Sequence, residues 1–226
     1  MNKTFSHPQI LGQSQSHLVT LPDNHQLHRL VINDWQALQQ AAKLAGINLQ
    51  IASSYRSFER QLAIWNNKAS GKRQLNDRNN QALNLDQLTQ QQLLDAILAW
   101  SALPGASRHH WGCEIDVYDP DMLAGQQLQL EPWEYQASGP MAPLGQWLDN
   151  NLATFGFYQP YRTDKGGVAI EPWHISHIAV SSQAAKQLSP SVLESALSHC
   201  DIELKTLILS QLSAIFSQYI NNVDLP

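Results

Sequence analysis

The stretch Ser107-Arg108-His109-His110-Trp111-Gly112-Cys113-Glu114-Ile115-Asp116 is the most informative part of the chain, together with Glu171-Pro172-Trp173-His174. The first segment offers an imidazole and a carboxylate seven residues apart, and the second offers a carboxylate and an imidazole three residues apart. Two histidines and one aspartate are a typical ligand set for a catalytic zinc, which keeps one coordination position open. The two segments therefore predict a zinc site made of His109, Asp116 and His174.

Glycine and proline shape the backbone of these segments. Gly112 permits the tight turn that brings His109 and Asp116 to one point, and Pro172 helps to hold the backbone before His174 rigid. The remaining carboxylate, Glu171, is then available as a base that takes a proton from the attacking water.

The triplet Glu-Pro-Trp alone carries little specificity, because it occurs a second time at residues 131–133, followed there by Glu134. The histidine in fourth position makes the later segment diagnostic. Cys113 also lies between two predicted ligands, but along a strand its side chain faces away from Asp116, so we do not expect a thiolate ligand. Cys113 and Cys200 are too few for a disulfide framework.

Composition limits the class of protein. The chain has 226 residues, of which 43% are apolar and 15% charged, which suits one ordinary folded domain. The net charge of −5 and the absence of a basic run argue against nucleic acid or an anionic membrane as the main partner. The amino terminus has no apolar core of a secretory signal, which predicts a cytoplasmic protein if Met1 is the native start.

Apolar periodicity and turn residues predict an α+β chain with few strands. The expected helices cover residues 35–45, 58–68, 89–101, 143–153 and much of the tail after Gln183, where the last helix begins behind Asp201 as N-cap. The expected strands cover residues 47–53, 114–118, 168–170 and 173–179. The polar segment 70–85 is expected to be a surface loop near a site. We divide the chain into a catalytic domain, 1–182, and a helical extension packed on the same domain, 183–226.

Three segments carry a family resemblance. Ser107-x-His109-x-x-Gly112-x-Glu114-x-Asp116 resembles the Ser-x-His-x-x-Gly-x-Ala-x-Asp motif of zinc D-alanyl-D-alanine carboxypeptidases and dipeptidases. Glu171-Pro172-Trp173-His174 looks like the second motif of that family, and Ser54-Tyr55-Arg56-Ser57, followed by Gln61, looks like its upstream motif. The motifs occur in the family's order and together span roughly residues 51–177.

The resemblance implies a fold and a set of roles. The fold would be the compact α+β fold shared with the hedgehog amino-terminal domain, built on a small antiparallel sheet. His109, Asp116 and His174 would bind one Zn²⁺, and Glu171 would be the catalytic base. Arg56 would polarise the scissile carbonyl and stabilise the oxyanion. Ser107 and Gln61 would contact the peptide or its terminal carboxylate, while Tyr55 would only pack.

Glu114 departs from the family pattern, which prefers alanine there. On a strand it shares a face with Asp116. It either orients a zinc-bound histidine from behind, or points into a widened pocket that selects a cationic substrate group, or contacts solvent. His110 and His177 are expected to pack or to support the ligands, not to bind the metal.

The predicted function is that of a zinc metallocarboxypeptidase that removes the terminal D-alanine from peptidoglycan stem peptides. The missing export signal favours cell-wall recycling, and hence an L,D-carboxypeptidase acting on tetrapeptides over a D,D-carboxypeptidase acting on pentapeptides. A non-catalytic, hedgehog-like zinc-binding module is the rival, disfavoured by the joint presence of Glu171 and Arg56. A metalloendopeptidase would share the site but need an open cleft. The expected partner is a small peptide, and the sequence does not distinguish a monomer from a dimer.

Overall fold

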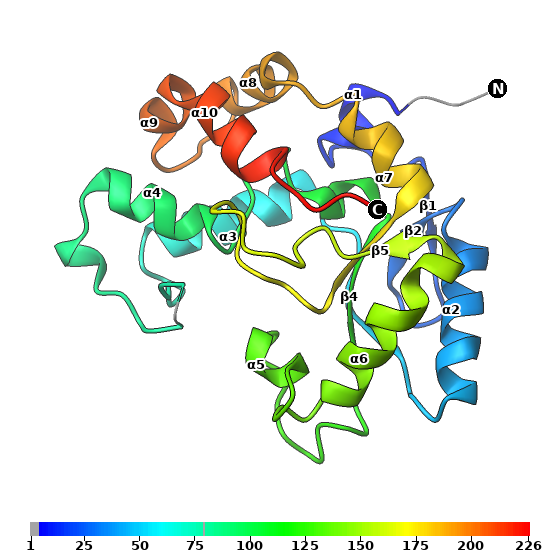
Figure 1. The fold of residues 1–226 in the computed structure, drawn as a ribbon. Coiled ribbons are helices and arrows are strands. Elements are labelled where there is room, and N and C mark those ends of the chain that lie inside the picture. Colours follow the sequence, from blue (N-terminus) through cyan, green and yellow to red (C-terminus); the bar gives the residue numbers. More distant parts are fainter. Residues whose placement is uncertain (1–4, 79) are drawn as a thin grey trace.

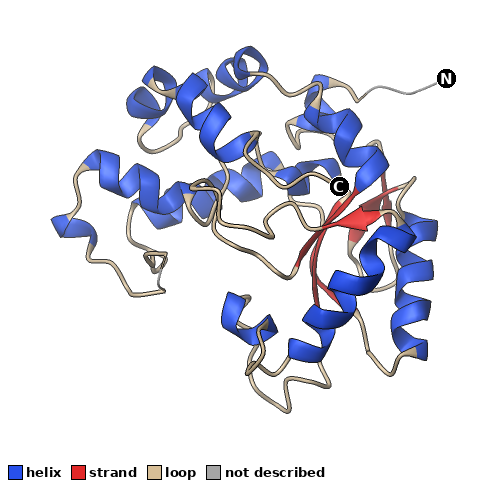
Figure 2. Cartoon of the chain, in the orientation of Figure 1, coloured by secondary structure: helices blue, strands red, loops and turns tan. Residues whose placement is uncertain are grey.

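A small antiparallel sheet surrounded by helices forms the fold, as the α+β prediction required (Figures 1 and 2). The computed structural model describes residues 5–78 and 80–226. Within them, the main sheet has the strand order β3-β4-β6-β5, and each neighbouring pair is antiparallel. Its strands are β3 (Gln50–Ser53), β4 (Glu114–Tyr118), β5 (Phe157–Tyr158) and β6 (His174–His177). A separate hairpin pairs β1 (Leu18–Thr20) with β2 (Gln26–His28).

The main helices form close to their predicted positions because their ends carry capping residues. Thr89 closes a capping box with Gln92, and the Ser57 hydroxyl accepts the Arg60 N–H. Gly46 follows the second helix with a φ of 79°. The α-helices are α1 (His7–Ile10), α2 (Ile32–Leu44), α3 (Phe58–Ala69), α4 (Gln90–Leu98), α5 (Pro132–Tyr135), α6 (Ala142–Asn151), α7 (Ile178–Ala185), α8 (Pro190–Ser198), α9 (Lys205–Ser210) and α10 (Leu212–Ile215). Short helical turns are η1 (Leu85–Gln87), η2 (Arg108–Trp111), η3 (Leu152–Phe155) and η4 (Phe216–Ile220).

The two central strands divide their residues between the core and a polar face. Ile115 and Ile175 are paired in register and fully buried, and Val117 is buried as well. The alternate positions of the same strands carry polar groups, with Glu114 opposite Ser176 and Asp116 opposite His174. Because side chains alternate along a strand, these four polar residues share one face of the sheet: Glu114, Asp116, His174 and Ser176.

Two of the predicted elements are wrong. Residues 168–170 form no strand, because the Ala169 N–H bonds to the carbonyl of Ala99 instead of to a strand. Asp201 is not an N-cap, since Leu204 adopts a positive φ of 63° and the helix begins only at Lys205. The short strands β1, β2 and β5 were not predicted.

The tail docks on the core. Ile208, Leu212 and Ile215 are buried in the same hydrophobic cluster as the sheet residues, and Trp65 of α3 donates its indole N–H to the carbonyl of Glu203 at 3.1 Å. The apolar stripe predicted on the tail is therefore a packing surface, while the division at residue 182 stays a prediction. No helix among the described residues has the length and apolar character needed to cross a membrane.

Candidate metal centre and active site

Strand pairing brings the first two predicted ligands together. Asp116 of β4 and His174 of β6 are direct partners in the antiparallel register, so their side chains leave the sheet side by side. Asp116 Oδ1 lies 3.0 Å from His174 Nδ1. Both side chains are almost fully buried. The carboxylate and the imidazole are thus held together by the sheet itself.

A tight turn adds the third ligand. His109 lies in η2, which ends at Gly112 with a φ of 69°. A Cβ at Gly112 would lie 2.3 Å from Leu18 Cδ2 and 3.0 Å from the backbone N of His28, so both the conformation and the packing require glycine. His109 Nε2 then lies 3.4 Å from Asp116 Oδ2. The predicted role of Gly112 is confirmed.

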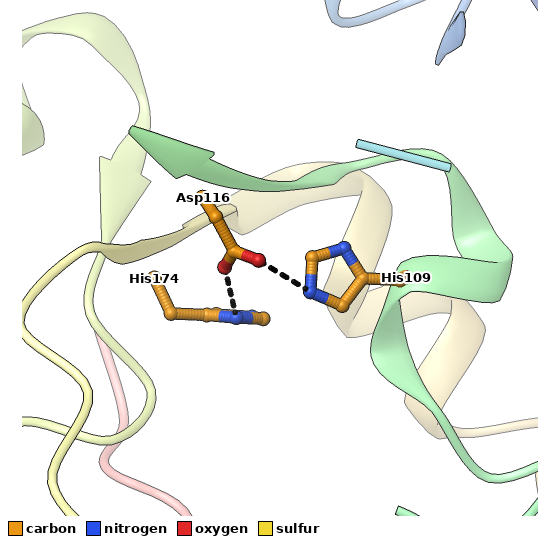
Figure 3. Close-up of side chains that lie close together, drawn as sticks. All are labelled: His109, Asp116 and His174. Atoms are coloured by element: carbon orange, nitrogen blue, oxygen red, sulfur yellow. Dashed lines mark ion pairs between the residues drawn. The ribbon is translucent and has the colours of Figure 1, made fainter. Parts of the chain in front are cut away.

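The three side chains converge as a set that could hold a metal ion, from η2, β4 and the start of β6 (Figure 3). One ligand atom of each of His109, Asp116 and His174 lies within 4.8 Å of the others. Asp116 Oδ1 and His174 Nδ1 are buried, and neither makes a hydrogen bond. Since buried polar atoms are costly without a partner, this pair fits a bound cation.

The second nitrogen of each imidazole has an acceptor behind it. His109 Nδ1 donates to the carbonyl of Ser54 at 2.8 Å, and His174 Nε2 donates to Glu114 Oε2 at 2.8 Å. These bonds fix the tautomers and leave His109 Nε2 and His174 Nδ1 free to face a metal. Two nitrogens and one carboxylate match the donor set of a zinc site with an open position.

The electrostatics of His174 also suit a cation. Burial lowers its pKa, but the neighbouring carboxylates of Asp116 and Glu114 overcome this and raise the pKa to about 10. A proton therefore occupies the imidazole when no metal is bound, and a metal ion would take the place of that positive charge.

Glu114 supports the site from behind. Its side chain is fully buried and bonds to His174, to the hydroxyl of Ser176 at 2.7 Å and to Arg108 Nη2 at 3.0 Å. Of the three roles considered from the sequence, the structure favours the one behind a zinc-bound histidine. The roles in the pocket and in solvent are wrong, because no part of Glu114 is exposed.

Arg108 is the main residue that sequence reasoning missed. Its guanidinium is buried, donates to Tyr158 Oη at 2.9 Å and to Ser176 Oγ at 2.8 Å, and forms the ion pair with Glu114. The charge on Glu114 at a position where the family prefers alanine was the available signal, since a buried carboxylate needs a cation.

Glu171 lies beside the ligand set. Its Oε2 is 3.5 Å from His174 Nδ1. Burial raises the pKa of Glu171 to about 7, with the Asp116 carboxylate acting in the same direction. A carboxyl group with a pKa near neutrality is suited to accept and return a proton.

A pocket of about 300 Å³ opens onto this cluster. Its lining includes six of the seven site residues predicted from the sequence: His109, Asp116, His174, Glu171, Arg56 and Ser107. Gln61 lies elsewhere. It is fully buried, accepts from Arg56 Nη1 at 2.9 Å and donates to the carbonyl of Ala102 at 2.7 Å. In this structure Gln61 holds Arg56, and both ends of its amide are occupied.

The other conspicuous side chains have structural roles. His110 bonds to the backbone of Gly105 and Arg56 at 3.0 and 2.6 Å. His177 contacts Asp34 at 2.8 Å and caps α7. Among the described residues, the cluster that could hold a metal ion contains neither of these histidines, and it does not contain Cys113. The Tyr55 hydroxyl donates to the carbonyl of Gly12 at 2.9 Å.

Comparison with known proteins identifies the family. A family model described as VanY, D-alanyl-D-alanine carboxypeptidase, matches residues 24–180. The chain belongs to the VanY family of D-alanyl-D-alanine carboxypeptidases. The predicted resemblance is thereby confirmed, and with it the carboxypeptidase type of function at the level of the family.

The chain is also similar to individual curated proteins and to solved structures. The chain is 43% identical over 121 residues to an uncharacterized protein of Haemophilus influenzae, covering 52% of this chain and 92% of that one. It is 27% identical to a D-alanyl-D-alanine carboxypeptidase of Enterococcus faecalis, covering 65% of this chain and 46% of the other. A solved D,D-pentapeptidase VanY mutant with bound zinc matches with a TM-score of 0.54 at 26% identity, covering 74% of this chain and 80% of that structure.

Proposed function

We propose that this VanY family member is a zinc-dependent carboxypeptidase that releases the terminal D-alanine of peptidoglycan stem peptides. The observation that carries the proposal is the position of Glu171, whose carboxylate lies 3.5 Å from His174 Nδ1 in a pocket shared with Arg56. A site that only stored zinc would need neither a proton acceptor beside the ligands nor a guanidinium facing them. The zinc-bound VanY structure supports zinc as the metal.

The side chains divide the reaction between them. His109, Asp116 and His174 would hold one Zn²⁺, which when bound supplies a Lewis acid at the scissile carbonyl. Glu171 takes a proton from the attacking water and delivers it to the leaving amine.

Arg56 donates to the oxygen that becomes negative as the carbonyl is attacked. Gln61 and the Ser53 hydroxyl, 2.9 and 3.4 Å from the guanidinium nitrogens, keep Arg56 in place. Ser107 lines the same pocket and is the proposed hydrogen-bonding contact to the peptide.

Purified protein loaded with one equivalent of zinc tests the proposal on tetrapeptide and pentapeptide stems. Release of D-alanine is expected from at least one of them and is lost on chelation. Release from the tetrapeptide would support the L,D specificity predicted above, and release from the pentapeptide alone would contradict it. No hydrolysis of either stem would favour the non-catalytic zinc-binding module. The cytoplasmic role in wall recycling stays a prediction, which fractionation of cells can check.

A further inference from the structure

A second group of polar side chains lines the pocket beside the metal ligands. Lys68 lies in the last turn of α3 and shares a helix face with Ile64, one turn earlier, and both line the pocket. Trp100 and Ser101, just after α4, line it as well. Helices α3 and α4 pack against each other (Figure 1), so their carboxyl-terminal ends form one wall of the pocket.

Lys68 has unused hydrogen-bonding capacity. Its half-buried ammonium donates to the Ser101 hydroxyl at 2.7 Å. Among residues 5–78 and 80–226, no carboxylate forms an ion pair with it. An ammonium has three N–H donors, and burying its charge is costly without an anion. Burial and the nearby charge of Arg73 lower the pKa of Lys68 to about 8, although the Glu171 carboxylate acts in the opposite direction.

The acidic groups of the pocket are committed elsewhere. Asp116 belongs to the metal ligands and Glu171 is the proposed base. Glu131, on the same lining, accepts from the Trp133 indole at 3.0 Å and from the Asn80 amide. Four cations also line the cavity: Arg56, Lys68, Arg73 and Arg108, of which Arg108 is paired with Glu114. An incoming anion is therefore the group that this wall is suited to bind.

A purely structural account of Lys68 is available and can be tested. A lysine in the last turn of a helix interacts favourably with the helix dipole. Lys43 has that position in α2, but it lies outside the pocket of the metal centre. It is therefore a control of the same residue type and helix position that does not line the pocket of the metal ligands.

We propose that Lys68 and Ser101 form a carboxylate-binding subsite that holds a free carboxylate of the substrate, with Arg73 beside it. The inference rests on the proposed peptidase function. The carboxylate comes either from the terminal residue that is released or from an internal acidic residue of the stem. Both sources offer the same chemistry, and the experiment separates them.

Binding to the zinc-loaded Glu171→Gln protein is measured by calorimetry with three stem peptides: unmodified, amidated at the terminal carboxylate, and amidated at the internal one. Lys68→Met is expected to weaken binding of the unmodified peptide by about 10–100-fold, the range of a charge-assisted hydrogen bond. Lys43→Met should have no effect. The amidated peptide whose affinity is no longer reduced by Lys68→Met identifies the carboxylate that the subsite holds. An equal loss with all three peptides, or no loss, overturns the proposal.

A second measurement uses the unmutated protein and needs no hydrolysis. Trinitrophenylation of Lys68, mapped by peptide mass, is compared in sodium acetate and in sodium chloride at equal ionic strength. Acetate is expected to slow modification of Lys68 several-fold and to leave Lys43 unchanged. Equal rates at Lys68 in the two salts contradict the subsite. Protection by acetate in a protein that hydrolyses no stem peptide would reject the peptidase function while keeping the subsite.

Discussion

The triplet Glu-Pro-Trp occurs twice in the chain, and the two copies have different structures. The first copy, at residues 131–133, begins the short helix α5. Pro132 is its first residue, Glu131 closes a capping box, and the Glu134 carboxylate accepts the backbone N–H groups of Gln129 and Glu131 at 3.2 and 2.9 Å. Every acidic group of this copy serves the local fold.

The second copy, at residues 171–173, leads into strand β6 through a turn closed by the His174 N–H and the Glu171 carbonyl at 3.1 Å. Trp173 is 4% exposed, compared with 43% for Trp133, and it packs on Tyr135 of α5. The strand then aligns His174 with Asp116 and leaves Glu171 beside them. The same three residues begin a helix in one place and lead into the proposed catalytic centre in the other. The difference comes from the fourth residue, which is Glu134 in the first copy and His174 in the second, and from the element formed, which is helix α5 in the first copy and strand β6 in the second.

Replacing the two glutamates in turn is the strongest test of this comparison. Glu171→Ala is expected to lower kcat by about 10²–10⁴-fold, because a positioned proton acceptor is lost. Its zinc content should stay at that of the wild type, since the three ligands remain.

Glu131→Ala is the matched control, as it removes the corresponding carboxylate from the lining of the same pocket. Its kcat should stay within a few-fold of the wild type. Steady-state kinetics and metal analysis of both proteins decide the matter, and equal losses of kcat would show that the two copies are not functionally distinct.

The next test removes Glu114, which supports His174, the residue that follows the second Glu-Pro-Trp triplet. Glu114→Ala takes away the acceptor that orients His174, so zinc affinity is expected to fall by about 10–100-fold. It also leaves the buried guanidinium of Arg108 without its counter-ion, which is expected to lower the free energy of unfolding by about 3–5 kcal/mol.

The double variant Glu114→Ala/Arg108→Leu separates the two effects. It should recover much of the stability and little of the zinc affinity, as measured by urea unfolding and chelator competition. Recovery of both quantities would mean that Glu114 acts only by neutralising Arg108.

The sequence predicted the backbone around the candidate metal centre well because its information is local. The turn at Gly112 and the strand Glu114–Tyr118 were placed correctly, and the alternation along that strand put Asp116 and Glu114 on one face while turning Cys113 away. The contact between Asp116 and His174 depends on strand register, which no single segment specifies. It was inferred from the residue types of the two segments and from the family resemblance, and the pairing of β4 with β6 explains it.

Elements held only by distant partners escaped prediction. Strand β5 has two residues and exists because it pairs with β6. The apolar run at 168–170 has strand composition but no neighbouring strand to pair with. Lys68 and Arg108 are ordinary cations in the sequence, and only the packing of α3 on α4 and of η2 on the sheet shows where their charges lie.

The comparison also predicts a difference in stability for the metal-free protein. Burial raises the pKa of Glu171 from 4.5 to about 7. Below pH 4.5 the carboxyl is protonated in both the folded and the unfolded state, so it has no effect on stability. Between pH 4.5 and 7 the unfolded state loses this proton while the folded state keeps it, so wild-type stability falls over that range and is level above it. Glu171→Gln removes this loss of stability. The variant should be more stable than wild type above pH 7, by up to about 3 kcal/mol, and equal to it near pH 4.

Glu131→Gln, which weakens a helix cap, should show no such gain in stability at any pH. Thermal unfolding in the presence of a chelator measures the stability of both variants. If Glu171→Gln is no more stable than wild type at pH 8, the Glu171 carboxylate is better solvated than its position in the pocket implies.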